Sequence, residues 1–350
     1  MTATATAHCG GHITLLFSID KSSSLMRSQG SRGAGFTIQH GVSIQGALLV
    51  RNDQIQGREM NGVQPDAKPE HIEPEDSTVH ITDTHGQPLE DPTLYLDFIQ
   101  ACREATLLRN HEYLEVQVRL ECPVSQGFGM SAAGLVALGR LVHALTGRGR
   151  PLQYEKIAHR IERLHGAGLG DVLGLSVGGV ELRTQPGAPG WPGDAVSFPV
   201  ESPVLLVWDP NEERHTASYI DDPVWQSTIT AAGETGVSVL NSGLWEPSRW
   251  RDLLEQSRAF AEASGMLEET VRANVYRAVL GAVQDAGMQA IVAARLCMLG
   301  SSVVVLPRRL DRIATIEELE TLAEALSEVG LSTMMTGVAP VNPRSGETGR

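Results

Sequence analysis

Residues 114–147 read LEVQVRLECPVSQGFGMSAAGLVALGRLVHALTG, and this stretch joins a strand pattern, a glycine-rich turn and a helix pattern. Apolar residues alternate with polar ones over 114–122, which is the period of a half-buried strand. Pro123 ends that pattern. From Ser131 the leucines recur at helical spacing, and Gly147 is typical of a helix C-terminus. The stretch therefore predicts a strand, a turn and a helix in immediate succession.

The turn between this strand and this helix has the composition of a phosphate-binding loop. Gly127 and Gly129 would let a ligand approach the backbone, and Ser131 stands at the expected helix start. The N–H groups of a helix N-terminus, together with the helix dipole, attract anions such as phosphates. Glycines often serve only to turn the chain, so a tight connection without a ligand is the alternative.

Two common nucleotide-binding motifs fit this turn poorly. Gly127, Gly129 and Ala132 match the dinucleotide pattern G-x-G-x-x-A, but that fold needs an acidic residue about 20 positions later. No Asp or Glu occurs in residues 123–154. The strand of that fold is also continuously apolar, whereas this one alternates. A Walker A loop is excluded because the sequence contains no Gly-Lys pair.

The segment PVSQGFGMSAAG at 123–134 resembles the phosphate-loop signature P-x-x-x-G-L-G-S-S-A-A of the GHMP kinases, which include galactokinase, homoserine kinase and mevalonate kinase. Three further segments resemble this superfamily in the expected order: GGHITLLF at 10–17, GSRGAGFTIQHGV at 30–42 and GLGDVLGLSVGGVELR at 168–183. Met130 departs from the common loop serine, and His12 lies near the catalytic lysine of mevalonate kinases. Archaeal-type pantoate kinases, which have Gly-His-Ile-Thr there, are the most similar subfamily.

This resemblance implies an α+β, GHMP-kinase-like fold of two domains: an N-terminal ribosomal-protein-S5-like α/β domain and a C-terminal ferredoxin-like α+β sandwich. It implies an ATP- and Mg2+-dependent kinase that converts pantoate to 4-phosphopantoate in coenzyme A biosynthesis. Two alternatives stay open: a GHMP kinase for another small hydroxy acid or alcohol, and a non-catalytic nucleotide-binding relative. The resemblance assigns ATP binding to the loop residues Pro123, Ser125, Gly127, Phe128, Gly129, Met130, Ser131 and Ala132.

Phosphoryl transfer to an alcohol requires a phosphate cradle, a magnesium ion and a group that handles the hydroxyl proton. The resemblance implies that Ser131 and Glu162 bind the metal. It places Asp171 near the acceptor hydroxyl, as a base or as an orienting group. Each residue has a structural alternative, because Ser131 and Asp171 could cap helices and Glu162 could face solvent.

Pantoate also carries a carboxylate, which favours a bidentate arginine. Arg183 follows a glycine pair and resembles the pantoate-binding arginine of the family. Arg32, with Ser31 beside it, is the second candidate, and its alternative is a surface loop position. His12 is the remaining candidate for a substrate contact, unless it only satisfies the core.

The composition is that of a globular enzyme. The 350 residues carry a formal net charge of −14, which disfavours nucleic-acid or anionic-membrane partners. The four cysteines are scattered, no apolar run reaches a membrane span, and the N-terminus lacks the features of a signal peptide. We therefore expect a cytoplasmic protein, and the resemblance implies a homodimer with a small-molecule substrate.

The segment GAPGWPGD at 187–194 concentrates Gly and Pro, so we expect the domain boundary near it. The prediction is an ATP-binding and catalytic domain at 9–190 and a GHMP-type domain at 191–340, with flexible tails at 1–8 and 341–350. Strands are expected at 12–19, 78–82, 114–122, 180–183, 204–208, 302–306 and 331–338, with a hairpin or two strands around Gly41 at 36–50. Helices are expected at 93–108, 131–146, 153–165, 249–264, 268–284, 286–299 and 316–329.

Overall fold

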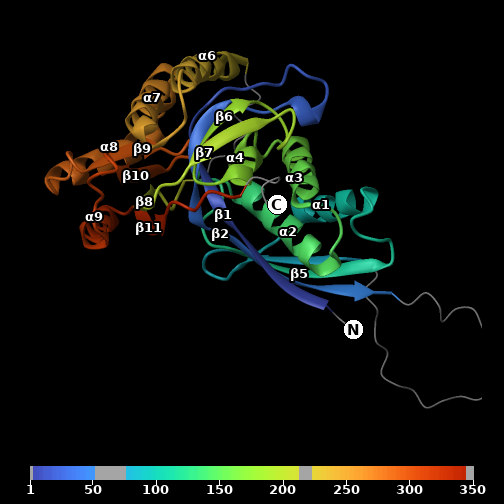
Figure 1. Ribbon diagram of the computed structural model, residues 1–350. Coiled ribbons are helices and arrows are strands. Elements are labelled where there is room, and N and C mark those ends of the chain that lie inside the picture. The colour runs from blue at the N-terminus through green and yellow to red at the C-terminus, as the bar shows by residue number, and fades with distance from the viewer. Residues whose placement is uncertain (1–2, 52–75, 213–222, 344–350) are drawn as a thin grey trace, which may run out of the picture.

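The computed structural model describes residues 3–51, 76–212 and 223–343, and within these ranges the chain forms two sheets (Figure 1). The larger sheet has the order β4-β3-β5-β2-β6-β7, with β1 also paired to β2. Its pairings are antiparallel except for β3 with β5. Its strands are β1 (Ala3–Phe17), β2 (Gly33–Val50), β3 (Thr78–Thr82), β4 (Pro88–Leu89), β5 (Glu112–Leu120), β6 (Val180–Gln185) and β7 (Asp194–Phe198).

The stretch at 114–147 folds as its pattern predicts. β5 alternates buried and exposed side chains from Leu114 onward. The helix α2 (Met130–Thr146) begins directly after the glycine-rich turn, and Gly147 follows it with a φ of 64°, the left-handed conformation of a helix end. The leucines of α2 are buried, and the helix contacts both β1 and β2. The predicted amphipathic strand and core-facing helix are thus confirmed.

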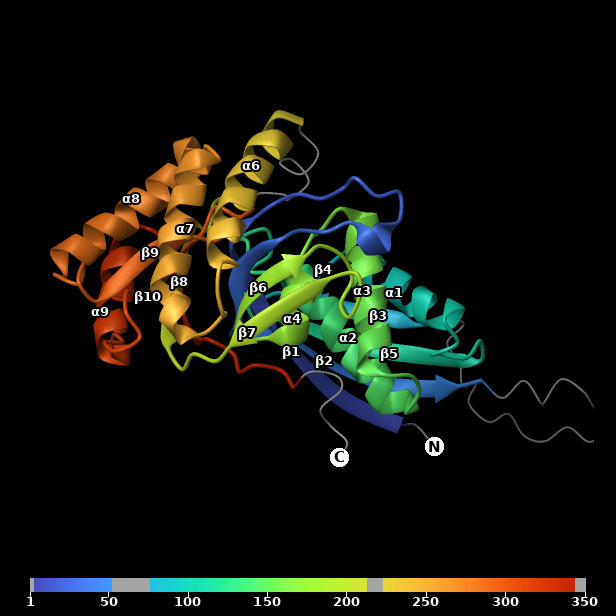
Figure 2. The ribbon, with the colours of Figure 1, turned by 45° about the horizontal axis from the view of Figure 1, so that its top comes forward.

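Three more helices accompany α2 at the larger sheet: α1 (Thr93–Glu104), α3 (Pro151–His165) and α4 (Asp171–Val177). The helices α1, α2 and α3 contact one another and lie together at one side of the molecule (Figure 2). The short helix α4 contacts β1, β2, β6 and β7, so it lies over the part of the sheet that these strands form.

The smaller sheet is antiparallel, in the order β11-β8-β10-β9. Its strands are β8 (Pro203–Trp208), β9 (Val292–Leu296), β10 (Val303–Pro307) and β11 (Ser332–Gly337). The accompanying helices are α6 (Pro223–Leu240), α7 (Trp250–Ala263), α8 (Thr270–Asp285) and α9 (Ile316–Glu328). Short 3-10 turns occupy Met26–Ser28, Pro247–Arg249 and Met266–Glu268.

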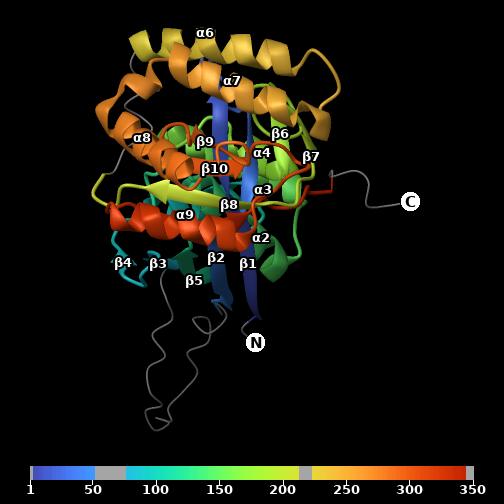
Figure 3. The same ribbon diagram turned by 90° about the vertical axis from the view of Figure 1, so that its left-hand side faces the viewer.

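The helices α8 and α9 cover the smaller sheet, whereas α6 and α7 lie side by side and also contact β1 (Figure 3). The two sheets with their helices confirm the predicted α+β class. None of the helices in the described ranges is long and apolar enough to cross a membrane.

Two predictions about the first 50 residues are wrong. Residues 3–8, predicted as part of a flexible tail, belong to β1 and pair with residues 43–48 of β2. The hairpin or strand pair predicted around Gly41 is instead the single strand β2. Gly41 serves close packing and not a turn, because a Cβ there would lie 2.1 Å from the carbonyl oxygen of Cys9.

Predictions near the C-terminus also need correction. The helix predicted at 286–299 is wrong, because this segment contains β9, the edge strand of the smaller sheet. Its side chains are buried on both faces except for Arg295, so it carries no period-two signal. The tail predicted from 341 is wrong at its start, since the Asn342 N–H donates to the Val177 carbonyl at 2.8 Å. Residues 1–2 and 344–350 of the predicted tails lie outside the described residues.

Neither α6 nor β7 was predicted from the sequence. β7 extends the larger sheet to Phe198, and the smaller sheet begins with β8 at Pro203. The chain therefore changes sheets about ten residues beyond the boundary proposed at 190. The two-domain division itself stays a prediction.

Candidate active site

A cleft of about 320 Å³ lies at the N-terminal end of α2. The turn before the helix reaches it through Gly127 and Gly129, whose φ angles of 84° and 67° belong to the left-handed region. No side chain caps the start of α2, so its backbone N–H groups and helix dipole are directed at the cleft. All the predicted nucleotide-binding residues line the cleft except Ala132, which is buried in the core. The geometry suits an anion such as a phosphate chain.

The phosphate loop, residues 123–131, is held between β1 and the turn that joins β9 to β10. The His12 N–H donates to the carbonyl of Phe128 at 2.9 Å. From the other side, Ser301 Oγ donates to the side-chain oxygen of Gln126 at 3.0 Å, and Ser302 Oγ donates to the Gln126 carbonyl. The larger sheet and the smaller sheet therefore both fix the position of the loop.

Ser131 and Asp171 line this cleft, and the buried Glu162 carboxylate lies beside them. Ser131 Oγ donates to Glu162 Oε1 at 2.7 Å. A Cβ at Gly168 would lie 2.6 Å from Glu162 Oε2 and 2.9 Å from Asp171 Oδ2, so both carboxylates flank the same point. The Glu162 side chain comes from the last turns of α3, and Asp171 is the first residue of α4. The structure thus brings these three predicted residues together.

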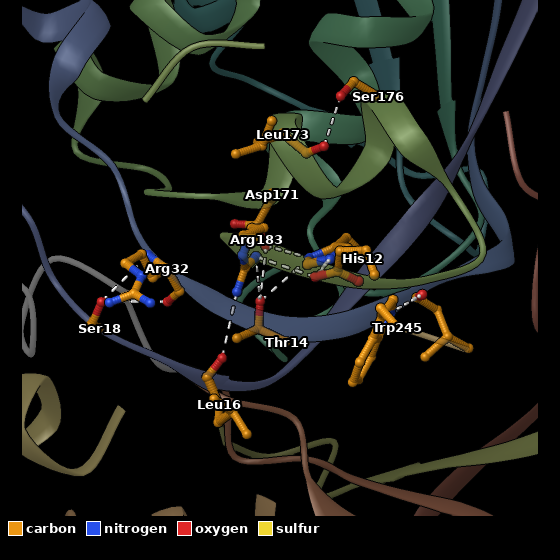
Figure 4. Close-up of polar contacts among 12 residues, drawn as sticks. His12, Thr14, Leu16, Ser18, Arg32, Asp171, Leu173, Ser176, Arg183 and Trp245 are labelled. Carbon is orange, nitrogen blue, oxygen red and sulfur yellow. Dashed lines mark hydrogen bonds and ion pairs between the residues drawn. The ribbon is translucent and has the colours of Figure 1, made fainter. Parts of the chain in front are cut away.

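Asp171 is bound from below by residues of β1 (Figure 4). Its Oδ1 is 2.6 Å from His12 Nδ1 and accepts a hydrogen bond of 3.3 Å from Thr14 Oγ1. The other ring nitrogen of His12, Nε2, is 3.1 Å from Glu181 Oε1. Arg183 lies beside this group, with Nη1 at 3.6 Å from Glu181 Oε1. Four ionisable side chains are therefore in one connected cluster beneath the cleft.

The surroundings of Glu162 and Asp171 shift the pKa values of these two carboxylates in opposite directions. Burial and the neighbouring Asp171 carboxylate raise the pKa of Glu162 to about 8, against the hydrogen bond from Ser131. Burial also favours the neutral form of Asp171, but the hydrogen bond and charge of His12, with the charge of Arg183, hold its pKa below its usual range. Asp171 is thus the ionised member of the pair near neutral pH.

The charge of His12 follows from the same contacts. Burial alone would lower the pKa of His12, but the Glu181 carboxylate and the hydrogen bonds with Asp171 and Glu181 raise it to about 9. His12 is completely buried and does not line the cleft. Its ring reaches the cleft only through Asp171 and Thr14, which line it.

The residues predicted to bind the acceptor lie at different distances from Asp171. Arg183 is only 1% exposed, and a Cβ at Gly170 would lie 2.2 Å from Ser31 Oγ and 3.0 Å from Arg183 Nη1, so Ser31 and Arg183 are neighbours behind Asp171. Arg32 is directed elsewhere, because its Nε donates to the Thr184 carbonyl at 3.0 Å and its Nη1 pairs with Glu234 of α6. None of these three residues lines the cleft, but Ser31 and Arg183 lie directly behind Asp171, which does, whereas Arg32 is directed away from it.

Three residues of the site were missed by the sequence reasoning. Thr14 and Glu181 each lie two positions from a predicted residue, on the same side of β1 and β6, so the period of a strand could have found them. Gln126 lies inside the loop motif, but its role depends on Ser301 and Ser302, about 175 residues away. Spacing in the sequence carries no signal for that contact.

The side chains at the cleft suit a magnesium ion. Mg2+ prefers oxygen ligands and commonly uses one or two carboxylates together with substrate phosphates. Ser131 Oγ and the buried Glu162 carboxylate form such an oxygen pair, directly beside the helix start that suits phosphates. Among the described residues, no group of three or more His, Cys, Asp or Glu could hold a metal by itself. A metal bound here would take further ligands from phosphate oxygens or water.

Comparison with known proteins agrees with this architecture. Residues 95–179 match the family model of the GHMP kinases N terminal domain. A pantoate kinase from Methanospirillum hungatei is 26% identical over 321 residues, which cover 88% of this chain and 89% of that protein. A solved structure described as a phosphotransferase related to the CoA biosynthesis pathway has a TM-score of 0.70 at 21% identity, covering 99% of this chain and all of that one. A mevalonate diphosphate decarboxylase from Enterococcus faecalis, solved with AMPPCP and magnesium, has a TM-score of 0.63 at 14% identity, covering 97% of this chain and 98% of that one.

The matched segment runs from α1 through the phosphate loop to the end of α4, and therefore includes Ser131, Glu162 and Asp171. The chain has the fold of the GHMP kinases, and its segment 95–179 matches their N-terminal domain. The matched family and the similar pantoate kinases indicate an ATP-dependent small-molecule kinase.

Proposed function

We propose that this kinase phosphorylates pantoate with ATP to give 4-phosphopantoate, a step toward coenzyme A. The observation that carries the proposal is the convergence of Ser131, Glu162 and Asp171 at one cleft, with Arg183 directly behind Asp171. A cationic side chain beside the orienting carboxylate suits an acceptor that carries its own carboxylate. The names of the similar pantoate kinases and of the CoA-pathway phosphotransferase support the same acceptor.

In the proposed mechanism the backbone N–H groups at the start of α2 bind the nucleotide phosphates, in the way helix N-termini bind anions. Asp171 Oδ2, the oxygen not used by His12, accepts a hydrogen bond from the acceptor hydroxyl and orients its oxygen toward the γ-phosphorus. The new bond forms between that oxygen and phosphorus as the bond between phosphorus and the ADP oxygen breaks, and the hydroxyl proton passes to Asp171 as the ester bond is completed. Because the transition state is loose, orientation and charge stabilisation contribute more than early proton removal.

Ser131 and Glu162 would hold Mg2+ at the phosphates. The ion would neutralise charge on the phosphate oxygens when bound. Glu162 must be ionised to serve as a ligand, so protons compete with the metal below its pKa of about 8. The buried position of this carboxylate keeps it directed at Ser131 in the ligand-free protein.

A panel of acceptors tests the substrate assignment. ADP release would be measured with ATP, Mg2+ and, in turn, pantoate, pantothenate, mevalonate and homoserine. We expect pantoate to have the highest kcat/KM in the panel. A preference for another acceptor would keep the kinase class and replace the substrate, and tight ATP binding without any phosphorylated acceptor would favour a nucleotide-binding relative without catalysis.

A further inference from the structure

His12 lies between two carboxylates and engages both with its ring nitrogens. Nδ1 is 2.6 Å from Asp171 Oδ1, and Nε2 is 3.1 Å from Glu181 Oε1. An ionised carboxylate only accepts hydrogen bonds, and a neutral imidazole has only one N–H to donate. Two such contacts to ionised carboxylates therefore require the imidazolium form of His12.

Packing alone does not explain why a glutamate occupies position 181. Its side chain is fully buried on a central strand, where an apolar residue would avoid the cost of burying a charge. Its Oε1 contacts His12 and lies 3.6 Å from Arg183 Nη1, while its Oε2 has no hydrogen-bond partner within the described residues. The charge of Glu181 is thus balanced by His12 and Arg183, and both of these contacts are made through Oε1.

The surrounding backbone is shaped to admit this cluster. A Cβ at Gly174, in the middle of α4, would lie 2.4 Å from His12 Nε2. A Cβ at Gly33 would lie 2.4 Å from Arg183 Nη2 and so obstruct the path of that side chain across β2. The short helix can therefore sit directly on the imidazole, with Asp171 at its first turn.

We propose that Glu181 is a positioning residue, which acts through the His12 imidazolium to hold the Asp171 carboxylate ionised and directed at the acceptor hydroxyl. The proposal rests on the proposed function, because it concerns how Asp171 meets an acceptor. Glu181 does not line the cleft, so it acts on turnover through the two charged side chains it contacts. An effect through His12 changes the pH profile of kcat, whereas an effect through Arg183 changes the KM for pantoate. Thr14 supports the same Asp171 oxygen from the side, at 3.3 Å.

The titratable and charged groups that face His12 come from three elements: Asp171 of α4, Glu181 and Arg183 of β6, and Glu162 of α3. Burial lowers the pKa of His12, and the charge of Glu181 is the largest influence that raises it, to about 9. Neutralising Glu181 should therefore let His12 lose its proton at a lower pH. Turnover should then decline at a lower pH as well, because Asp171 loses its cationic partner.

The kinetic test uses Glu181→Gln and Glu181→Asp in the full chain, with ATP, Mg2+ and pantoate. For Glu181→Gln we expect kcat to fall about 10- to 100-fold with the KM for ATP within about twofold, since only orientation of the acceptor is lost. The alkaline decline of kcat should move down by about one to two pH units from its wild-type position near 9. Glu181→Asp keeps the charge and should recover part of kcat and the wild-type profile.

Glu112→Gln is the matched control, because Glu112 is also a buried carboxylate on the larger sheet but pairs with Arg148 away from the cleft. It should alter stability without moving the pH profile. A wild-type profile in Glu181→Gln, or the same shift in the control, would overturn the proposal.

A second measurement covers the case in which Glu181→Gln does not fold. The His12 ring nitrogens would be followed by 15N NMR in the ligand-free wild-type protein from pH 5 to 10. Retention of both ring protons up to pH 8 supports the proposal, and loss of a proton near the ordinary value of about 6.5 refutes it. Because no acceptor is present, this result is independent of the panel: a protonated His12 with no pantoate turnover would reject pantoate and keep the cluster.

Discussion

Asp171 is the single residue on which the proposed chemistry depends most, because it lines the cleft and its Oδ1 is fixed by His12. Asp171→Asn keeps the size of the side chain but removes the charge that orients the hydroxyl. We expect kcat to fall by roughly 10²- to 10⁴-fold, the range of positioned acid–base groups, while the ATP dissociation constant changes little. Steady-state kinetics and nucleotide titration measure the two quantities. Undiminished turnover would move the orienting role to another residue.

The two candidate arginines differ in a way that predicts unequal effects. Arg183 lies behind Asp171, whereas Arg32 pairs with Glu234 and the Thr184 carbonyl. Arg183→Ala should raise the KM for pantoate at least about tenfold more than the KM for ATP, because a bidentate partner of a carboxylate is lost. Arg32→Ala should have the smaller effect on pantoate. A larger effect at Arg32 would reverse this assignment.

At the scale of elements, His159 joins α3 to the turn Met26–Ser28, with Nε2 at 3.3 Å from the Met26 carbonyl and 3.1 Å from the Gln29 carbonyl. Burial lowers the pKa of His159 to about 4. The unfolded chain therefore binds the extra proton between about pH 6.5 and 4, and stability falls as the pH falls through this window.

The predicted loss from His159 is of the order of 3 kcal/mol between pH 7 and pH 4. His159→Gln can donate to the same carbonyls without titrating, so its unfolding free energy should depend less on pH than that of the wild type. Urea unfolding at pH 7 and pH 4.5 measures the difference. Equal pH dependence in the two proteins would contradict the lowered pKa of His159 in the folded protein.

The elements also show where local patterns predict structure and where they do not. β5 and α2 were predictable because each has one apolar face, and the period of that face reveals the element. β9 lacks such a period because its side chains are buried on both faces of the strand. The helix α6 contains Gly233 and Gly236, which are poor helix formers, and Gly233 is there to pack closely on β1.

At the scale of the whole molecule, the two sheets meet at the phosphate loop. Ser301 and Ser302 bind Gln126 from the turn after β9, so displacement of the smaller sheet would displace the loop. Replacing both serines by Ala should raise the KM for ATP by up to roughly 30-fold, since each net hydrogen bond contributes about 1 kcal/mol and about 1.4 kcal/mol corresponds to a factor of ten. Ser327→Ala, which removes a surface hydroxyl bound within α9, is the control. An unchanged KM in the double variant would mean that the loop holds its shape without the smaller sheet.

The sequence alone determined the strand β5, the glycine-rich turn and the helix α2, because their patterns are local. The resemblance to GHMP kinases singled out Ser131, Glu162 and Asp171 as site residues, and their roles stay predictions. The tertiary structure decided which side chains Asp171 would meet. Glu181 and Thr14 reach it from strands β6 and β1, and Arg32 turns away toward α6. The period of a strand places Thr14 on the side of His12 and Glu181 on the side of Arg183. Whether these side chains meet Asp171 depends on strand register and on the packing of α4 over the sheet, which sequence spacing does not encode.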